Sequence, residues 1–171
     1  MGKIGKEKKV KLIIGMLTKD EQLFEETEDI LKRQFKKIEL ASCIFAFDET
    51  EYYKEEFGEG LKRKFISFKK LILEGSISKI KVYTNSIEEK FSLSGKRRIN
   101  IDPGYIGSGK LVLASTKDSY HRVYLNNGIY GECTLYFYKG EFREFPWTYP
   151  DFRKEEYKNF FLSVRKAYLK N

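Results

Sequence analysis

The alternation of apolar and polar positions is clearest in the first sixty residues. Residues 10–17 form an apolar run with a single lysine, which predicts a buried strand. Thr18 and Glu21 then have the spacing of a capping box, and apolar residues recur at helical spacing as far as Phe35. A second apolar run over residues 40–47 predicts another strand. Together these elements predict a strand-helix-strand unit with its helix on one sheet face.

The middle of the chain has a less decisive pattern. Apolar residues between Leu61 and Ile72 recur at helical spacing, yet residues 65–68 alternate as a strand does, and both possibilities stay open. Residues 77–91 predict a helix, which Gly95 ends.

The C-terminal half contains a hairpin pattern. Two strand-like segments, residues 120–125 and 129–138, flank the loop sequence Asn126-Asn127-Gly128. A two-residue loop mixes apolar and polar groups on both faces, so we expect all three residues to form the loop. The apolar face is then expected to contain His121, Val123, Leu125, Ile129, Cys133, Leu135 and Phe137.

The opposite face of this expected hairpin is rich in tyrosine. It contains Tyr124 and Tyr136 among five tyrosines, and Arg122 lies directly opposite Glu132. Tyrosine rings can stack on nucleic-acid bases and form hydrogen bonds through their hydroxyls. The competing interpretation is a half-solvated sheet face with one cross-strand ion pair.

A third strand-like segment, residues 96–105, precedes the hairpin. Arg98, Asn100 and Asp102 share one face of this segment, while Ile99 and Ile101 share the other. Beside the hairpin, its polar face would complete a pocket in which arginines bind phosphate and Asp102 and Glu132 bind magnesium or ribose. The alternative is a turn at Pro103-Gly104 that Asp102 caps.

Other chemistry-bearing residues follow Asp102. Residues 104–111 match seven positions of a phosphate-binding loop, but Leu111 stands where Ser or Thr would hold magnesium, so we reject that motif. Lys117 is a further candidate for anion binding. His121 is a candidate acid-base group, although a lone histidine on an apolar face is usually structural.

Composition excludes several classes of protein. The chain has 171 residues, 41% of them hydrophobic and only three of them proline, so it is not a disordered or low-complexity protein. Cys43 and Cys133 lie ninety positions apart, a spacing typical of neither a disulfide framework nor a metal site, and we expect both in the core. One histidine is too few for a multi-histidine metal site. No secretory leader and no membrane span is expected, so we expect a cytoplasmic protein.

The net charge of +8 is unevenly distributed along the chain. Residues 1–19 carry a net +5, residues 20–59 a net −8, and residues 60–171 a net +11. A basic region of this size favours a polyanionic partner such as RNA or a nucleotide. A highly charged, solubilising surface explains the same counts equally well.

The pattern as a whole predicts an α/β (α+β) fold. We expect one globular domain over residues 1–171, with a short basic tail of about residues 1–8. The strand-helix-strand unit is followed by a mainly antiparallel C-terminal sheet and a C-terminal helix.

Several segments together resemble the bacterial domain-of-unknown-function family 4416. The resemblance covers nearly the whole chain and implies an intracellular bacterial domain, but it supplies no established activity. The segments that carry it are residues 48–53, 60–68, 80–81, 84–85, 97–105, 111–117, 121–125 and 147–151.

Three functional hypotheses follow from these residues. The first is a binding domain for a phosphorylated or nucleic-acid ligand, held by Arg98, Asn100, Lys117, Arg122, Tyr124 and Tyr136. The second is a small enzyme acting on a phosphorylated small molecule, with Asp102 and Glu132 as metal or acid-base groups and His121 as a further candidate. The third is a protein-interaction module that uses the acidic residues 20–59.

Overall fold

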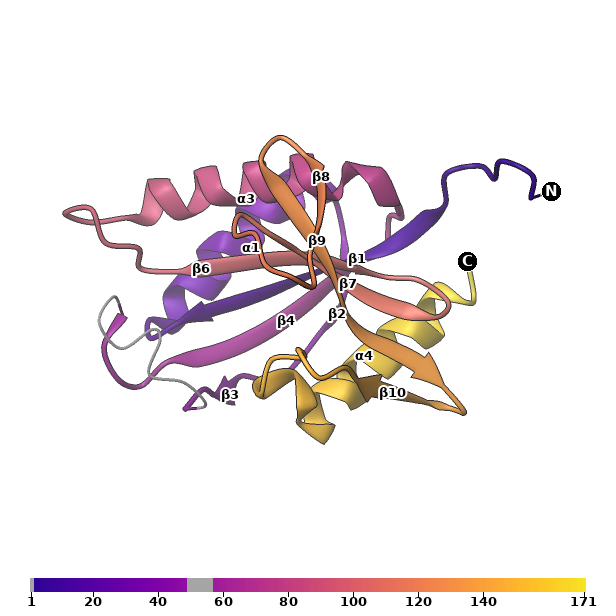
Figure 1. Ribbon diagram of the computed structural model, residues 1–171. Helices are drawn as coiled ribbons and strands as arrows, with labels where there is room; N and C mark the ends of the chain where they lie inside the picture. Colours follow the sequence, from indigo (N-terminus) through magenta and orange to yellow (C-terminus); the bar gives the residue numbers. More distant parts are fainter. Residues whose placement is uncertain (1, 49–56) are drawn as a thin grey trace.

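The computed structural model describes residues 2–48 and 57–171, which fold into one antiparallel sheet with helices on both faces (Figure 1). The helices are α1 (Glu21–Phe35), α3 (Ile77–Phe91) and α4 (Glu155–Tyr168), with 3-10 turns η2 (Glu74–Ser76) and η3 (Asp151–Arg153). The strands are β1 (Lys9–Thr18), β2 (Ile38–Ala41), β3 (Phe45–Ala46), β4 (Lys62–Phe68), β5 (Ile72–Leu73), β6 (Asn100–Ile106), β7 (Lys110–Ser115), β8 (Val123–Asn126), β9 (Ile129–Tyr138) and β10 (Glu141–Glu144).

The sheet confirms the predicted α+β architecture. Its main strand order is β10-β9-β7-β6-β1-β4-β2, with β3 on β4, β5 on β1 and β8 on β9. The strand-helix-strand unit is formed by β1, α1 and β2, but β4 lies between the two strands and pairs antiparallel with both. The second strand is also shorter than expected, because the segment predicted over residues 40–47 is divided into β2 and β3.

Both faces of the central strand β1 are buried, which explains its continuous apolar run. Leu12, Ile14 and Met16 pack into a core beneath α1 and α3. On the opposite face, Ile13 belongs to a second core that α4 covers with Tyr157, Phe161 and Val164. A strand between two helical layers needs apolar side chains on both faces.

The start of α1 differs from the prediction by two residues. Asp20, not Thr18, is the N-cap, and its side chain accepts a hydrogen bond from the Gln22 amide at 3.2 Å. The Thr18 hydroxyl accepts from the Asp20 amide and donates to the carbonyl of Arg98 at 2.7 Å. Thr18 therefore joins β1 to the segment before β6, a tertiary role that local spacing does not reveal.

In the middle of the chain, the structure decides between the helix and the strand that the sequence left open for residues 61–72. The segment from Lys62 to Phe68 is strand β4, and α3 occupies the predicted range 77–91. Residues 104–111 form the end of β6, a tight turn and the start of β7. A phosphate-binding loop leads from a strand into a helix, so this β-hairpin confirms that the sequence match is accidental.

The expected register of the β8–β9 hairpin is partly wrong. Asn127 and Gly128 both have positive φ and form a two-residue loop, and Asn126 pairs with Ile129. The extra residue is a bulge at Leu125, which restores the predicted pairing of Val123 with Gly131.

The faces of this hairpin also differ from the prediction. Val123 and Leu125 are 69% and 40% exposed and lie in β8, an edge strand that pairs with β9. In β9, a second irregularity opposite Leu111 and Val112 adds one residue to the strand. Ile129 therefore packs beneath α1 and α3, whereas Leu135 packs beneath α4.

The two cysteines do not lie in the core, where we expected them. Cys43 is exposed because it lies in the break between β2 and β3, and Cys133 is half-buried in β9. Both are free thiols.

Several carboxylates of the acidic segment, residues 20–59, form ion pairs within the chain. They pair with basic residues on neighbouring strands: Glu28 with Lys64, Glu39 with Lys11 and Glu21 with Lys62. Residues 49–56 of this segment lie outside the described residues. Among the helices that the structure describes, none is long and apolar enough to cross a membrane.

Candidate functional site

The candidate site begins where β6 and β7 separate. These strands pair only from Gly104 to Ile106, opposite Leu111 to Leu113. At Gly104 an added Cβ would lie 2.4 Å from the carbonyl oxygen of Val112, so only glycine permits this close approach. Beyond it, Pro103 has no N–H to offer β7, and the ladder stops.

Side chains from α3 occupy the place that a neighbouring strand would take. The backbone N–H of Ile101 donates to Glu88 Oε1 at 2.6 Å, and the Ile101 carbonyl accepts from Lys81 Nζ at 2.8 Å. Both groups point away from β1, as does the carbonyl of Pro103 two residues later. The backbone of β6 is therefore satisfied by a helix, and the gap beside it remains open.

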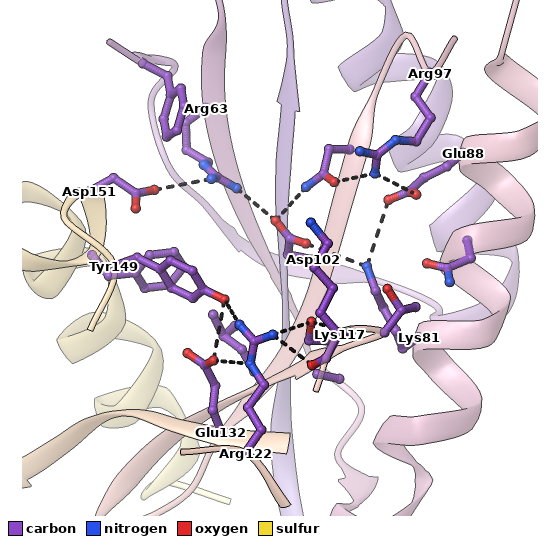
Figure 2. Close-up of a pocket in the computed structure, with 18 of the residues that line it drawn as sticks. Arg63, Lys81, Glu88, Arg97, Asp102, Lys117, Arg122, Glu132, Tyr149 and Asp151 are labelled. Atoms are coloured by element: carbon purple, nitrogen blue, oxygen red, sulfur yellow. Dashed lines mark hydrogen bonds and ion pairs between the residues drawn. The ribbon is translucent and has the colours of Figure 1, made fainter. Parts of the chain in front are cut away.

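This gap forms a cavity of about 520 Å³ between α3 and the segment that leads into α4 (Figure 2). Its walls carry an unusual number of charges for the interior of a sheet. The basic residues are Arg63, Lys81, Arg97, Lys117 and Arg122, and the acidic residues are Glu88, Asp102, Glu132 and Asp151.

Asp102 lies at the centre of the first cluster of charges. Its Oδ2 accepts from Asn100 Nδ2 at 2.7 Å and from Arg63 at 3.3 Å, and Lys81 Nζ lies 3.6 Å from Oδ1. Arg63 reaches across from β4 and also donates to Asp151 at 3.2 Å. Strands β4 and β6 and the turn η3 are thus connected through one guanidinium, as Figure 2 shows.

Glu132 is the centre of the second cluster. Its Oε2 accepts from Arg122 Nε at 2.7 Å and lies 3.1 Å from His121 Nε2. Arg122 also donates to the Tyr149 hydroxyl at 2.5 Å and to the Lys117 carbonyl at 2.8 Å. These contacts join β9, the β7–β8 loop and the segment before η3. Burial, reinforced by the nearby Glu132 carboxylate, raises the pKa of the Tyr149 hydroxyl, so it stays protonated.

Two of the carboxylates have raised pKa values because they are buried. Burial raises the pKa of Glu88, although Lys81, the Ile101 amide and Arg97 partly oppose it. Burial likewise raises the pKa of Asp151, and Arg63 opposes that effect. The pocket therefore contains two acids that are easier to protonate than ordinary surface carboxylates.

The structure brings five of the predicted site residues to this pocket: Asn100, Asp102, Lys117, Arg122 and Glu132. The predicted contact between Arg122 and Glu132 is confirmed. The predicted direct pairing of the two polar strands is wrong, since β7 lies between β6 and β9. The alternative turn at Asp102 is wrong as well, because Pro103 and Gly104 continue β6.

The other predicted residues lie elsewhere. Arg98 points away and pairs with Asp20 at 2.7 Å on the surface. His121 contacts Glu132 from behind the pocket wall and stacks on Trp147, instead of facing the apolar core. Tyr124 is 57% exposed beside Tyr130, and Tyr136 packs against Phe145.

Sequence reasoning missed several wall residues. Lys81 and Glu88 share one stripe of α3 with Asn85, at spacings of four and three residues, and this helical pattern was a usable signal. Arg63, Arg97, Tyr149 and Asp151 lie within segments that carry the family resemblance. No local pattern places them together, because they come from distant parts of the chain.

The carboxylates do not cluster as a metal site would require. Within residues 2–48 and 57–171, no group of three or more His, Cys, Asp and Glu side chains is placed to hold a metal ion. Asp102 already faces Arg63 and Lys81, and Glu132 already faces Arg122. These cations repel a divalent metal from both carboxylates.

Comparison with known proteins identifies a family but no activity. No curated protein and no solved structure matches the chain. The model of a domain of unknown function, DUF4416, matches residues 8–168, nearly the whole chain, and the chain therefore belongs to that family.

Proposed function

We propose that this protein is a binding domain for a small phosphorylated molecule, which occupies the pocket between β6 and β7. The observation that carries the proposal is the convergence of five basic side chains on one cavity of about 520 Å³. A volume of this size suits a molecule such as a nucleotide or a sugar phosphate.

The pocket walls offer groups for the rest of such a ligand. Phe47, Tyr149 and Phe152 line the cavity and provide flat apolar surface. Asn85 and Asn100 contribute amides that can both donate and accept hydrogen bonds. Aromatic walls with a few polar groups and several cations are the combination that a phosphorylated organic molecule requires.

A small ligand is favoured over an RNA strand. Arg63, Lys81 and Arg122 are buried between α3 and the segment before η3, with side chains 4%, 6% and 9% exposed, and a continuous polymer backbone has little room to reach them. The exposed tyrosines of the hairpin, which suggested base stacking, lie outside this pocket.

The enzymatic alternative has weaker support. Glu132 receives hydrogen bonds from Arg122 and from the Thr134 hydroxyl, and its side chain is only 1% exposed. A carboxylate held in this way is suited to orienting Arg122, because both of its oxygens already accept hydrogen bonds from the protein.

A thermal-shift and calorimetric panel tests the proposal. It compares nucleoside monophosphates and sugar phosphates with their unphosphorylated parents, and adds an RNA oligomer in a salt series. We expect the small phosphorylated compounds alone to raise the melting temperature, since a ligand that binds only the folded state stabilises it. A steep loss of affinity with salt, seen only for RNA, would indicate a polymer ligand and contradict the proposal.

Two matched variants locate the binding site. Lys117→Met removes a cation from the pocket wall, whereas Arg98→Met removes an exposed cation outside it. We expect Lys117→Met to weaken binding by about tenfold, the effect of losing one charge-assisted hydrogen bond, and Arg98→Met to have no effect. Equal affinities for both variants, or no binding by any phosphorylated compound, would refute the proposed pocket.

A further inference from the structure

Arg63, Lys81, Arg97 and Arg122 of the pocket are already paired with carboxylates of the protein. Arg63 bridges Asp151 and Asp102, and Arg97 donates to Glu88 at 3.3 Å. A phosphate group is bound by the same guanidinium N–H donors that now bind these carboxylates. A phosphorylated ligand must therefore compete with the pocket's own acids for the arginines.

One competing acid lies on each side of the pocket. Asp151 lies in η3 and Glu88 on α3, and their side chains are 6% and 7% exposed. Asp102, between them, is more open at 27%. A buried carboxylate that loses its cation cannot turn to water for compensation, which makes Glu88 and Asp151 the sensitive partners.

Building on the proposed function, we propose that the pocket binds its ligand by exchange. The ligand phosphate takes the guanidinium groups of Arg63 and Arg97. Asp151 then loses Arg63, Glu88 loses Arg97 and keeps Lys81 at 3.9 Å, and both carboxylates take up protons from solvent. The phosphate replaces the displaced carboxylates as the partner of the arginines, so the buried charge stays balanced.

The surroundings of both carboxylates support this exchange. Glu88 faces Lys81 on its own helix, Arg97 from the following segment, and Asp102 with the Ile101 amide from β6. Asp151 faces Arg63 from β4 and Asp102 from β6. Burial already raises the pKa of each carboxyl, and a neighbouring phosphate raises it further through like-charge repulsion.

The direction of the pH effect follows from linkage. If binding takes up protons, affinity for a ligand of constant charge increases as the pH falls. In the limit, each proton taken up changes the affinity by about tenfold per pH unit. Inorganic sulfate is a suitable probe because it remains a dianion over the whole range, unlike a phosphate monoester, whose second pKa is about 6.

The experiment measures sulfate and nucleoside monophosphate affinity for the full chain at several pH values, by calorimetry in buffers of different ionisation enthalpy. The test variant is Glu88→Gln with Asp151→Asn, which keeps the shape of both side chains and removes the competing charges. We expect this variant to bind about tenfold more tightly near pH 8 and to lose most of the pH dependence.

Two further variants exclude other origins of a pH effect. His121→Asn removes the only histidine, the side chain type that ordinarily changes charge between pH 5 and 8, and should retain the pH dependence. Asp20→Asn removes a carboxylate paired with Arg98 on the surface and should bind as the wild type does.

Each outcome decides between the two proposals. Binding with proton uptake that disappears in the double variant supports the exchange. Binding that is independent of pH and unchanged in the double variant overturns the exchange and leaves the proposed function standing. Absence of binding by every probe, in the wild type and in the double variant, overturns both.

Discussion

The Arg63–Asp151 pair of the pocket and the Asp29–Lys32 pair on α1 each join a basic side chain to an aspartate, but in opposite environments. Arg63 and Asp151 are 4% and 6% exposed, whereas Asp29 and Lys32 on α1 are 65% and 47% exposed. An exposed pair exchanges water contacts for weak Coulomb attraction and adds little stability. A buried pair must first recover the large free energy lost when both charges leave water.

This difference indicates what the pocket charges are for. Apolar residues of similar volume would often stabilise such a site as well as a buried ion pair does. The α4 side of the sheet shows that option, since Phe65, Phe152 and Phe161 pack there around Tyr157. Nine charged side chains in a neighbouring cavity are thus poorly explained by stability, which favours a binding role.

The largest expected effect comes from removing the cation of the buried pair. Arg63→Met leaves Asp151 and Asp102 without their shared partner, and we expect it to lower the free energy of unfolding by about 3 to 5 kcal/mol. Urea denaturation measures this change. Adding Asp151→Asn and Asp102→Asn to the same chain should restore part of the loss, because the uncompensated charges are then absent. A loss below 1 kcal/mol would place the pair in the same class as the surface pairs.

A smaller effect concerns the pH dependence of stability in the ligand-free protein. The folded-state pKa values of Glu88 and Asp151 are raised. The stability that their protonation provides is therefore fully present when the pH is below the ordinary pKa of a carboxyl group. That stability is lost as the pH rises through the folded-state values.

The double variant Glu88→Gln with Asp151→Asn isolates this contribution, because neither site titrates in it. We expect the wild type to lose on the order of 1 kcal/mol relative to this variant as the pH rises from about 4 to about 8. Unfolding measurements across that range provide the test. A constant difference, or a wild type that gains with rising pH, would show that burial does not dominate at these carboxylates.

The same contrast explains what the sequence could predict. The unit of β1, α1 and β2 follows from periodicity, because each element buries a face that its own residues define. The contact of Arg122 with Glu132 also follows from alternation within one hairpin. The bulge at Leu125 and the two-residue loop of Asn127 and Gly128 did not follow from alternation. The predicted loop was one residue too long and the predicted strand lacked the one-residue bulge, so the two errors cancelled and the pairing beyond the bulge was still correct.

The pocket was predictable only in part. Asn100 and Asp102 share a face of β6 for local reasons, and both line the cavity. The cavity itself depends on the separation of β6 from β7 at Pro103, and on α3 reaching Ile101 through that gap. A tertiary opening of this kind leaves no periodic signal, so Arg63 and Tyr149 could not be placed beside Asp102 from their spacing.

The smallest expected effect tests the exposed side of the comparison. Arg98 was a sequence candidate for ligand binding, and its partner Asp20 remains the N-cap of α1. Arg98→Ala removes a pair whose side chains are 48% and 39% exposed, so we expect a change of about 0 to 1 kcal/mol in the free energy of unfolding. High salt should reduce even this change, because exposed charges are screened. A loss of several kcal/mol at Arg98 would mean that exposure does not separate the two groups of ion pairs, and the proposed binding role of the pocket charges would lose its physical basis.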